Sequence, residues 1–176
     1  FIFMNKLCVL LTRDSEKCYI SGELILRSQS NLRRQRKMKT IWLVVPCYNE
    51  EEVLPETSRQ LKAVMNSMIE RGKISPESKI TFVNDGSKDG TWDIISSLCA
   101  EDSLFAGINL SRNRGHQNAL LAGLMTAKKY ADAAISLDAD LQDDVDVVEK
   151  MVDNFLAGDD IVYGVRSSRK TDTFFS

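Results

Sequence analysis

The sequence predicts an α/β fold, in which a mostly parallel, Rossmann-like sheet carries helices on both faces. Short apolar runs alternate with stretches of helical periodicity from residue 41 onward. Repeated strand–helix units of this kind form parallel sheets with right-handed crossovers. The chain has 176 residues, of which 43% are hydrophobic and 27% are charged. These values are typical of one soluble globular domain and exclude a fibrous or disordered protein.

Five strands are expected, each a short apolar run that ends in turn or polar residues. Residues 41–46 read IWLVVP, a continuous apolar run that is typical of a strand buried on both faces. Residues 79–84 form the second strand, which is closed by the turn residues DGSKDG. The remaining strands are predicted over 105–111, 133–138 and 160–165.

Four helices are expected between and after these strands. The first covers residues 50–72, where apolar side chains fall on one helical stripe and Gly72 is placed to end the helix. The other helices are predicted over 91–102, 116–130 and 144–158. The stripe of the first helix consists of Leu54, Leu61, Val64, Met65 and Met68.

Charge divides the chain into two parts. Residues 1–39 hold nine Lys/Arg against three Asp/Glu, whereas residues 40–176 hold fourteen against twenty-two. We predict that 1–39 is a basic, poorly ordered extension, which could attract anionic lipid or nucleic acid, and that 40–176 is the folded domain. Met38 lies directly before the first strand, so we expect the native domain to start near it.

Four polar segments follow the first four predicted strands. They are PCYNE, NDGSKDG, SRNRGH and DADLQDD, at residues 46–50, 84–90, 111–116 and 138–144. In parallel sheets ligands bind outside the carboxyl ends of the strands. The sequence therefore predicts that the polar chemistry converges on one edge of the sheet.

The acidic segment after the fourth strand has two interpretations. Asp138 and Asp140 are two apart at a strand end, where both could bind one Mg²⁺ or Mn²⁺ while substrate phosphates complete the shell. A solvated helix start is the alternative, and it accounts well for Asp143 and Asp144 as capping residues. An EF-hand is excluded because Asp143 occupies the position where its loop requires glycine.

Other common sites are not supported by the sequence. It contains no G-K-[ST] of a P-loop and no G-x-G-x-x-G of a dinucleotide fold. One histidine, His116, cannot build a His-based metal site, and a structural or capping role is at least as reasonable for it as catalysis. The four cysteines form no C-x-x-C pair and are interpreted as idle thiols. We expect no signal peptide, and no apolar stretch reaches the ~18–20 residues of a membrane span.

Five motifs together resemble the catalytic domain of glycosyltransferase family 2, in particular its polyprenyl-phosphate branch. They are VVPCYNEEEVL, FVNDGSKDGT, LSRNRGHQNALLAG, SLDADLQD and VYGVRSSRKTDTFF. They occur in the order and at the spacing of the family, over roughly residues 41–176. The resemblance implies a fold of the GT-A type, whose nucleotide-binding part would be residues 40–176 of this chain, and it implies that further C-terminal residues of the catalytic domain are missing.

The resemblance also implies roles for individual residues. Asn84 departs from the aspartate of many relatives, and Val145 and Asp146 replace a common proline-containing turn. The nucleotide would be bound by Pro46, Tyr48, Glu50, Asp85, Gly86 and Ser87, with Asp85 on the base. The metal and the diphosphate would be bound by Asp138 and Asp140 with Gln142 beside them, and phosphate of the donor or acceptor by Arg166 and Arg169.

The function implied is metal-dependent, inverting transfer of a hexose from a UDP- or GDP-sugar to a polyprenyl phosphate, with Mg²⁺ or Mn²⁺ as cofactor. The full-length protein would be held at the cytoplasmic face of the membrane by C-terminal helices, with no nucleic-acid partner. Transfer to a saccharide and a non-catalytic nucleotide-binding piece are the alternatives. The sugar, the acceptor, the activity of this piece and its oligomeric state remain open.

Overall fold

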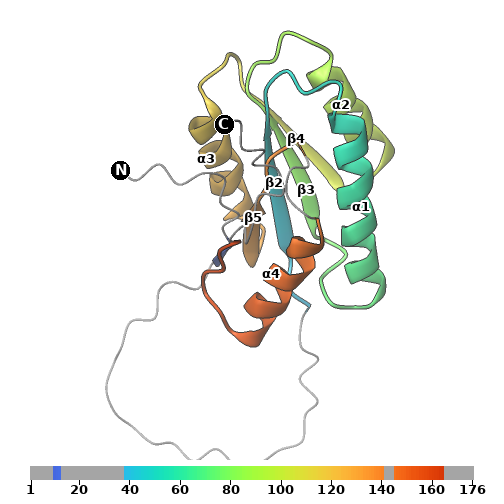
Figure 1. Cartoon of the computed structure of the whole chain (residues 1–176), viewed down its shortest axis with the longest axis vertical. Helices are drawn as coiled ribbons and strands as arrows, with labels where there is room; N and C mark the ends of the chain where they lie inside the picture. The colour runs from blue at the N-terminus through green and yellow to red at the C-terminus, as the bar shows by residue number, and fades with distance from the viewer. Residues whose placement is uncertain (1–9, 13–37, 141–144, 165–176) are drawn as a thin grey trace, which may run out of the picture.

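The computed structural model describes residues 10–12, 38–140 and 145–164, which form a five-stranded sheet with helices on both sides (Figure 1). The strands lie in the order β1-β5-β2-β3-β4. In chain order the elements are β1 (Leu10–Thr12), β2 (Ile41–Cys47), α1 (Leu54–Glu70), β3 (Lys79–Asn84), α2 (Thr91–Glu101), β4 (Phe105–Asn109), α3 (His116–Ala127), β5 (Ala133–Ser136) and α4 (Asp146–Ala157).

The sheet is parallel except at one edge, which confirms the predicted fold class. Strand β2 pairs in parallel with β3 and β5, and β3 pairs in parallel with β4. Strand β1 adds an antiparallel edge, with Leu10 opposite Ile135 and Thr12 opposite Ala133. The chain therefore runs β2, β3, β4 in one direction and then returns to place β5 on the other side of β2. This reversal of strand order lies between β2 and β5.

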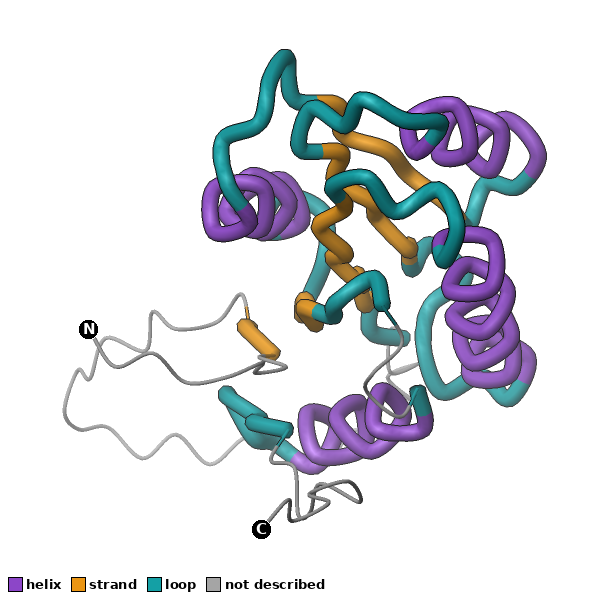
Figure 2. Tube along the Cα trace, turned by 45° about the horizontal axis from the view of Figure 1, so that its top comes forward, coloured by secondary structure: helices purple, strands orange, loops and turns teal. Residues whose placement is uncertain are grey.

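Two hydrophobic cores lie on the two faces of the sheet. The larger core joins the sheet to α1, α2 and α4 through buried residues such as Leu43, Met65, Ile95 and Val148. The smaller core, around Val44, lies under α3. Figures 1 and 2 show α3 by itself on its side of the sheet, opposite α1 and α2.

Helix α3 packs unusually close to the strands because one of its residues has no side chain. A Cβ added to Gly123 would lie 2.3 Å from Val44 Cγ1 and 2.9 Å from Val83 Cγ2. The buried positions of α3 are Ala119, Gly123 and Ala127, so only small residues face the sheet. The larger side chains of this helix therefore turn sideways or outward.

The boundaries of α1 agree with the predicted stripe and its stop signal. Leu54, Leu61, Met65 and Met68 are buried, and Val64 packs against them from the side. Gly72 follows the helix with φ of +65°, the left-handed conformation that commonly ends a helix. Strands β4 and β5 end two residues earlier than predicted, because Leu110 and Leu137 each donate one last backbone hydrogen bond, to Asn84 and Val44, and then leave the sheet.

The predicted fifth strand over 160–165 is wrong within the described residues. Residues 160–164 contain only a single bridging residue, Tyr163. The next strand along the chain would be expected beside β5, but β1 already pairs with the outer edge of β5. Ile161 and Tyr163 are accordingly 52% and 56% exposed. Strand β1 itself lies in the part of the chain that the sequence predicts to be unstructured.

Candidate functional site

The carboxyl ends of four parallel strands carry the polar segments that the sequence singles out. Tyr48 follows β2, Asp85 follows β3, Arg112 follows β4 and Asp138 follows β5. The parallel pairing brings these four positions to one edge of the sheet, as predicted. The loops after β2 and β5 flank the point where the strand order reverses, which is where open α/β sheets bind their ligands.

The loops after β2 and β3 are joined by hydrogen bonds. Asn49, with φ of 55°, donates its backbone N–H to Ser87 Oγ at 3.0 Å and accepts the Lys88 N–H on its side chain at 2.9 Å. Glu50 donates its N–H to Thr91 Oγ1 at 2.8 Å. The exposed Tyr48 and the half-buried Glu50 thus stand on a loop whose backbone is fixed by the next loop.

Pro46 fits a central strand because its missing N–H faces a gap in the ladder. Val44 accepts a hydrogen bond from Leu137 on the β5 side, and alternation along the strand turns Pro46 to the same side. The last β2–β5 pair is Val44 with Ser136, so no strand lies beside Pro46 there. The proline is buried in the sheet directly below the loop that carries Tyr48.

Asp85 fixes the loop that follows β4. Its side chain is 2% exposed, and its two carboxylate oxygens accept the backbone N–H groups of Arg114 at 2.6 Å and Gly115 at 2.8 Å. The neighbouring Gly86 has φ of +68°, and a Cβ there would lie 2.5 Å from backbone atoms of Arg112 and Asn113. The sequence predicts Asp85 and Gly86 as nucleotide contacts; what the structure shows is that both lie against the 112–115 loop, which Asp85 holds by hydrogen bonds.

Asn84, at the end of β3, is a polar residue whose partners the sequence does not reveal. It is 3% exposed, donates its side-chain amide to Asn109 Oδ1 at 2.8 Å and accepts the Ser87 N–H at 3.2 Å. It therefore links the ends of β3 and β4 to the loop that begins with Asp85. A buried amide at a strand end is the signal that could have indicated this network.

The acidic pair is anchored through the residue between its two members. Ala139 is 4% exposed in the larger core, and its carbonyl accepts a hydrogen bond from Thr57 Oγ1 on α1 at 2.6 Å. Asp138 and Asp140 on either side are half-buried, and both take part in interactions within the protein. Anchoring the middle residue fixes the backbone from which both carboxylates project.

His116 lies beside the acidic pair. It is the first residue of α3, and its Nε2 is 3.8 Å from Asp138 Oδ1, an ion pair when the imidazole is protonated. The side chain is 52% exposed. The sequence predicts the edge of the sheet at which His116 lies but leaves its role open. The crossover from β4 through α3 to β5 brings His116 next to Asp138 only in the folded chain.

Helix α4, which follows the acidic segment, is tied to α1 by an ion-pair cluster. Glu149 accepts two hydrogen bonds from Arg71, at 2.9 and 2.8 Å, and pairs with Lys73, which also contacts Asp153 at 2.8 Å. Hydrogen bonding to Arg71 and Lys73 lowers the pKa of Glu149 to about 2. Helix α1 and the residues directly after it therefore hold the chain on both sides of the acidic segment, at Ala139 and at Glu149.

The described residues fit part of a divalent-cation shell. No group of three or more His, Cys, Asp or Glu side chains suitable for a metal occurs within 38–140 and 145–164. Two carboxylates at a strand end suit Mg²⁺ or Mn²⁺ when substrate phosphates and water supply the remaining ligands. The two described carboxylates therefore fit a cation whose remaining ligands come from elsewhere, such as a phosphorylated substrate.

Several predicted residues lie outside the part of the chain that the structure describes. They are Gln142, Asp143, Asp144, Arg166 and Arg169. Of the cysteines, Cys47 and Cys99 are described as free thiols. Burial raises the pKa of the Cys47 thiol far above its usual value, so this residue is no nucleophile although it ends β2 at the candidate site.

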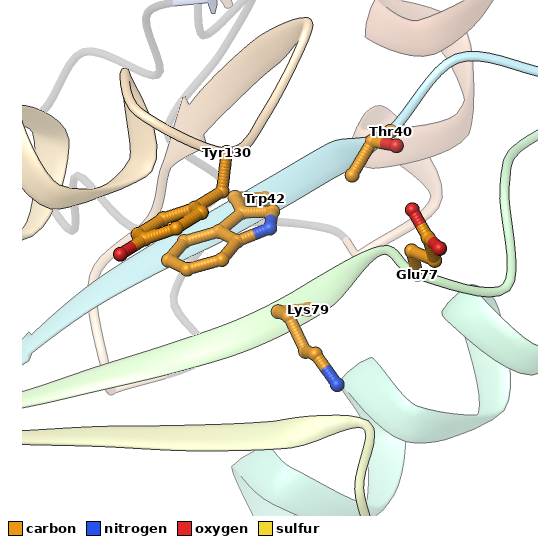
Figure 3. Close-up of a pocket in the computed structure, with 5 residues that line it drawn as sticks. All are labelled: Thr40, Trp42, Glu77, Lys79 and Tyr130. Carbon is orange, nitrogen blue, oxygen red and sulfur yellow. The ribbon is translucent and has the colours of Figure 1, made fainter.

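A cavity of about 310 Å³ lies at the opposite end of the sheet, on the α3 face (Figure 3). The ring of Trp42, near the start of β2, stacks on Tyr130 with centroids 5.5 Å apart. Tyr48 is six positions beyond Trp42 along the chain, about 20 Å at the rise of a strand. This cavity is therefore distinct from the acidic edge. Its lining consists of Thr40, Trp42, Glu77, Lys79 and Tyr130.

Comparison with known proteins identifies the family. The signature of glycosyl transferase family 2 matches residues 42–176. The uncharacterized glycosyltransferase YkoT of Bacillus subtilis (strain 168) is 50% identical over 141 residues, which are 80% of this chain and 42% of that protein. The bactoprenol glucosyl transferase of Shigella phage SfV is 41% identical over 133 residues, which are 75% of this chain and 40% of that protein.

The structure is also similar to the crystal structure of S. aureus TarS 1–349 in complex with UDP. The TM-score is 0.47 and the sequence identity is 19%, and the match covers 65% of this chain and 32% of that chain. The chain spans about two fifths of the length of YkoT and of the phage enzyme. In the described ranges, none of the helices has the length and apolarity needed to cross a bilayer. The match to the family covers three quarters of the sequence and includes all four loops at the acidic edge, and the chain belongs to glycosyltransferase family 2.

Proposed function

We propose that the protein transfers a hexose from a UDP- or GDP-sugar to a polyprenyl phosphate, in a metal-dependent reaction with inversion at the anomeric carbon. The observation that carries this proposal is the position of Asp138 and Asp140. They stand at the reversal of strand order, beside the loop of Tyr48 and Glu50.

The loops after β2 and β3 would bind the nucleotide of the donor. Pro46, Tyr48 and Glu50 line one side of the nucleotide pocket, and Ser87 and Gly86 close it from the next loop. Asp85 would contact the base, and its two carboxylate oxygens also accept the backbone N–H groups of Arg114 and Gly115. We expect Asp85 to act also through the position of the 112–115 loop, which these two hydrogen bonds fix.

Asp138 and Asp140 would hold a divalent cation, Mg²⁺ or Mn²⁺, whose charge stabilises the diphosphate leaving group. The two aspartates project from a backbone that Thr57 anchors at Ala139, so they meet the cation with little rearrangement. His116, 3.8 Å from Asp138, would orient this carboxylate and, when protonated, add positive charge near the leaving group. Gln142, Arg166 and Arg169 are proposed as further ligands of cation and phosphate.

The proposed acceptor suits a site of this composition. A lipid phosphate monoester has a second pKa of about 6 and is largely ionised at neutral pH, so its oxygen attacks without a strong general base. The one described thiol at the edge, Cys47, is buried and its pKa is raised, so it supplies no thiolate nucleophile. Direct displacement by the phosphate inverts the configuration. The bactoprenol in the name of the phage relative supports an acceptor of this class.

Calorimetric titration with UDP and with GDP, each with and without Mn²⁺, tests the proposal. We expect one of the two nucleotides to bind, with an affinity that rises at least tenfold when Mn²⁺ is present, as expected where cation and diphosphate share one site. Absence of binding by both nucleotides in the presence of Mn²⁺ would refute the proposed donor site. Membrane association and a cytoplasmic-face location remain part of the proposal.

A further inference from the structure

The outer surface of α3 is apolar and carries no negative charge. Leu121 and Met125 are each 55% exposed and lie one turn apart, and Tyr130 beyond the helix is 63% exposed. We call these three residues the α3 surface. Helix α3 stands by itself on its side of the sheet (Figure 2), and no described helix covers it. Leu121 and Met125 are neighbours on the outer side of the helix, and apolar side chains grouped in this way indicate an interaction surface.

The charged residues nearest to α3 along the chain are positive, in an otherwise acidic domain, although Glu77 lies near Tyr130 in the cavity of Figure 3. Residues 103–131 hold four Lys/Arg and no Asp/Glu, although residues 40–176 as a whole hold fourteen against twenty-two. Arg112 and Arg114 precede the helix, Lys128 and Lys129 follow it, and all four are exposed. An apolar patch flanked by basic residues at both ends of a helix is typical of contact with an anionic bilayer.

A second exposed apolar group gives an internal comparison. Leu156, Ile161 and Tyr163 are 42%, 52% and 56% exposed at the end of α4 and beyond it. Their exposed neighbours include Asp159 and Asp160. Anionic lipid would be repelled there, so the charge pattern selects the α3 surface and not the α4 end.

We propose that the α3 surface docks on an anionic membrane, with α3 lying in the plane of the interface. Leu121 and Met125 would enter the headgroup region, with Tyr130 at its level, while Lys128 and Lys129 pair with lipid phosphates. Stacking on Trp42 holds the Tyr130 ring in place (Figure 3), which reduces the entropy lost on insertion.

Docking in this orientation would bring the acidic edge close to the bilayer. His116 begins α3 and lies 3.8 Å from Asp138, and α3 is about 18 Å long at the rise of an α-helix. Asp138 would therefore stand within one helix length of the inserted residues. This inference extends the proposed function, since it says where the membrane that carries a polyprenyl phosphate meets the protein.

Vesicle flotation of the whole chain tests the inference without nucleotide or metal. We expect more protein on vesicles of phosphatidylcholine mixed with phosphatidylglycerol than on phosphatidylcholine alone, and less in high salt. Leu121→Gln combined with Met125→Gln should weaken partition to the mixed vesicles about tenfold. Lys128→Gln combined with Lys129→Gln should do the same on mixed vesicles and change little on neutral ones.

Leu156→Gln on α4 is the matched control, because it removes an exposed leucine outside the basic region and should leave partition unchanged. Circular dichroism establishes that each variant is folded. Equal binding of the wild type to both vesicle types, or equal partition of the Leu121/Met125 variant and the control, overturns the inference. A dimer in light scattering that the Leu121/Met125 variant dissociates overturns it as well, because a second copy then covers the surface. Failure of nucleotide binding would leave these results untouched, so the two proposals fail separately.

Discussion

Replacing Thr57 by valine tests how the acidic pair is positioned. Thr57 is fully buried on α1, and its Oγ1 donates to Ala139 at 2.6 Å and also lies 3.0 Å from the Val53 carbonyl of its own helix. Valine keeps the shape of threonine and removes only the hydroxyl. The variant therefore leaves the core packed and takes away the anchor between Asp138 and Asp140.

The magnitude follows from the burial of both partners. Ala139 is 4% exposed, so its carbonyl loses a hydrogen bond that water does not easily replace. Leaving a buried polar group unsatisfied costs about 1–3 kcal/mol. A loss of about 2 kcal/mol lowers the melting temperature of a domain of this size by about 4–8 °C. If Asp138 and Asp140 bind the cation from this anchored backbone, losing the hydrogen bond also weakens Mn²⁺-dependent nucleotide binding. We expect the loss of affinity to be about tenfold and at most about thirtyfold.

Thermal unfolding and calorimetric titration with nucleotide and Mn²⁺ measure the two effects. Thr57→Ser keeps the hydroxyl and should restore most of the affinity. Ser58→Ala is the matched control, because Ser58 is 4% exposed and its hydroxyl bonds within α1 to the Pro55 carbonyl at 2.8 Å. The reasoning is refuted if Thr57→Val and Ser58→Ala bind the nucleotide and Mn²⁺ as tightly as the wild type.

Two further predictions concern the loops and the helices around the site. Gly86→Ala should lower the free energy of unfolding by about 2 kcal/mol or more and abolish nucleotide binding, since its Cβ meets the backbone of residues 112–113 at 2.5 Å. Gly72→Ala, with a similar φ of +65° and nothing within 4 Å, should cost only the backbone strain, and equal unfolding energies of the two variants would contradict this. Glu149→Gln should lower the free energy of unfolding by about 1 kcal/mol at neutral pH, because its partly exposed ion pairs with Arg71 and Lys73 are lost. The pKa of Glu149 is about 2 in the folded protein against an ordinary 4.5, so its contribution is complete above about pH 4.5 and disappears as the pH falls toward 2. Urea unfolding across this range should therefore show the variant and the wild type converging in acid, and a constant difference would count against the ion-pair cluster.

The fold class and the edge where polar residues gather could be predicted from the sequence. Continuous apolar runs such as 41–46 need burial on both faces, and parallel pairing then brings every strand end to the same side. The end of the first helix at Gly72 could also be predicted, because the left-handed backbone conformation that ends a helix strongly favours glycine. The sequence predicts a fifth strand over 160–165, which the described residues lack. The edge of β5 is occupied by β1, and no local sequence pattern could have indicated this pairing.

Long-range contacts in the site could not be predicted. The sequence places Asp85 in a turn. Its hydrogen bonds from the backbone N–H groups of Arg114 and Gly115, however, depend on the path of the loop after β4, which passes beside Asp85 only in the folded chain. Thr57 lies within the predicted first helix but outside its apolar stripe, and only the packing of α1 against the segment after β5 brings its hydroxyl to the Ala139 carbonyl. The same holds for His116, which the crossover through α3 brings to Asp138.

Titration of the Asp140→Asn variant with nucleotide in the presence and absence of Mn²⁺ is the most direct test of the proposed site. Asparagine has nearly the same shape as aspartate but lacks its charge, so the fold should remain intact by circular dichroism. We predict that the gain in nucleotide affinity on adding Mn²⁺, present in the wild type, disappears in this variant. An unchanged Mn²⁺-dependent affinity would contradict the assignment of Asp140 to the cation and remove the basis of the proposed mechanism.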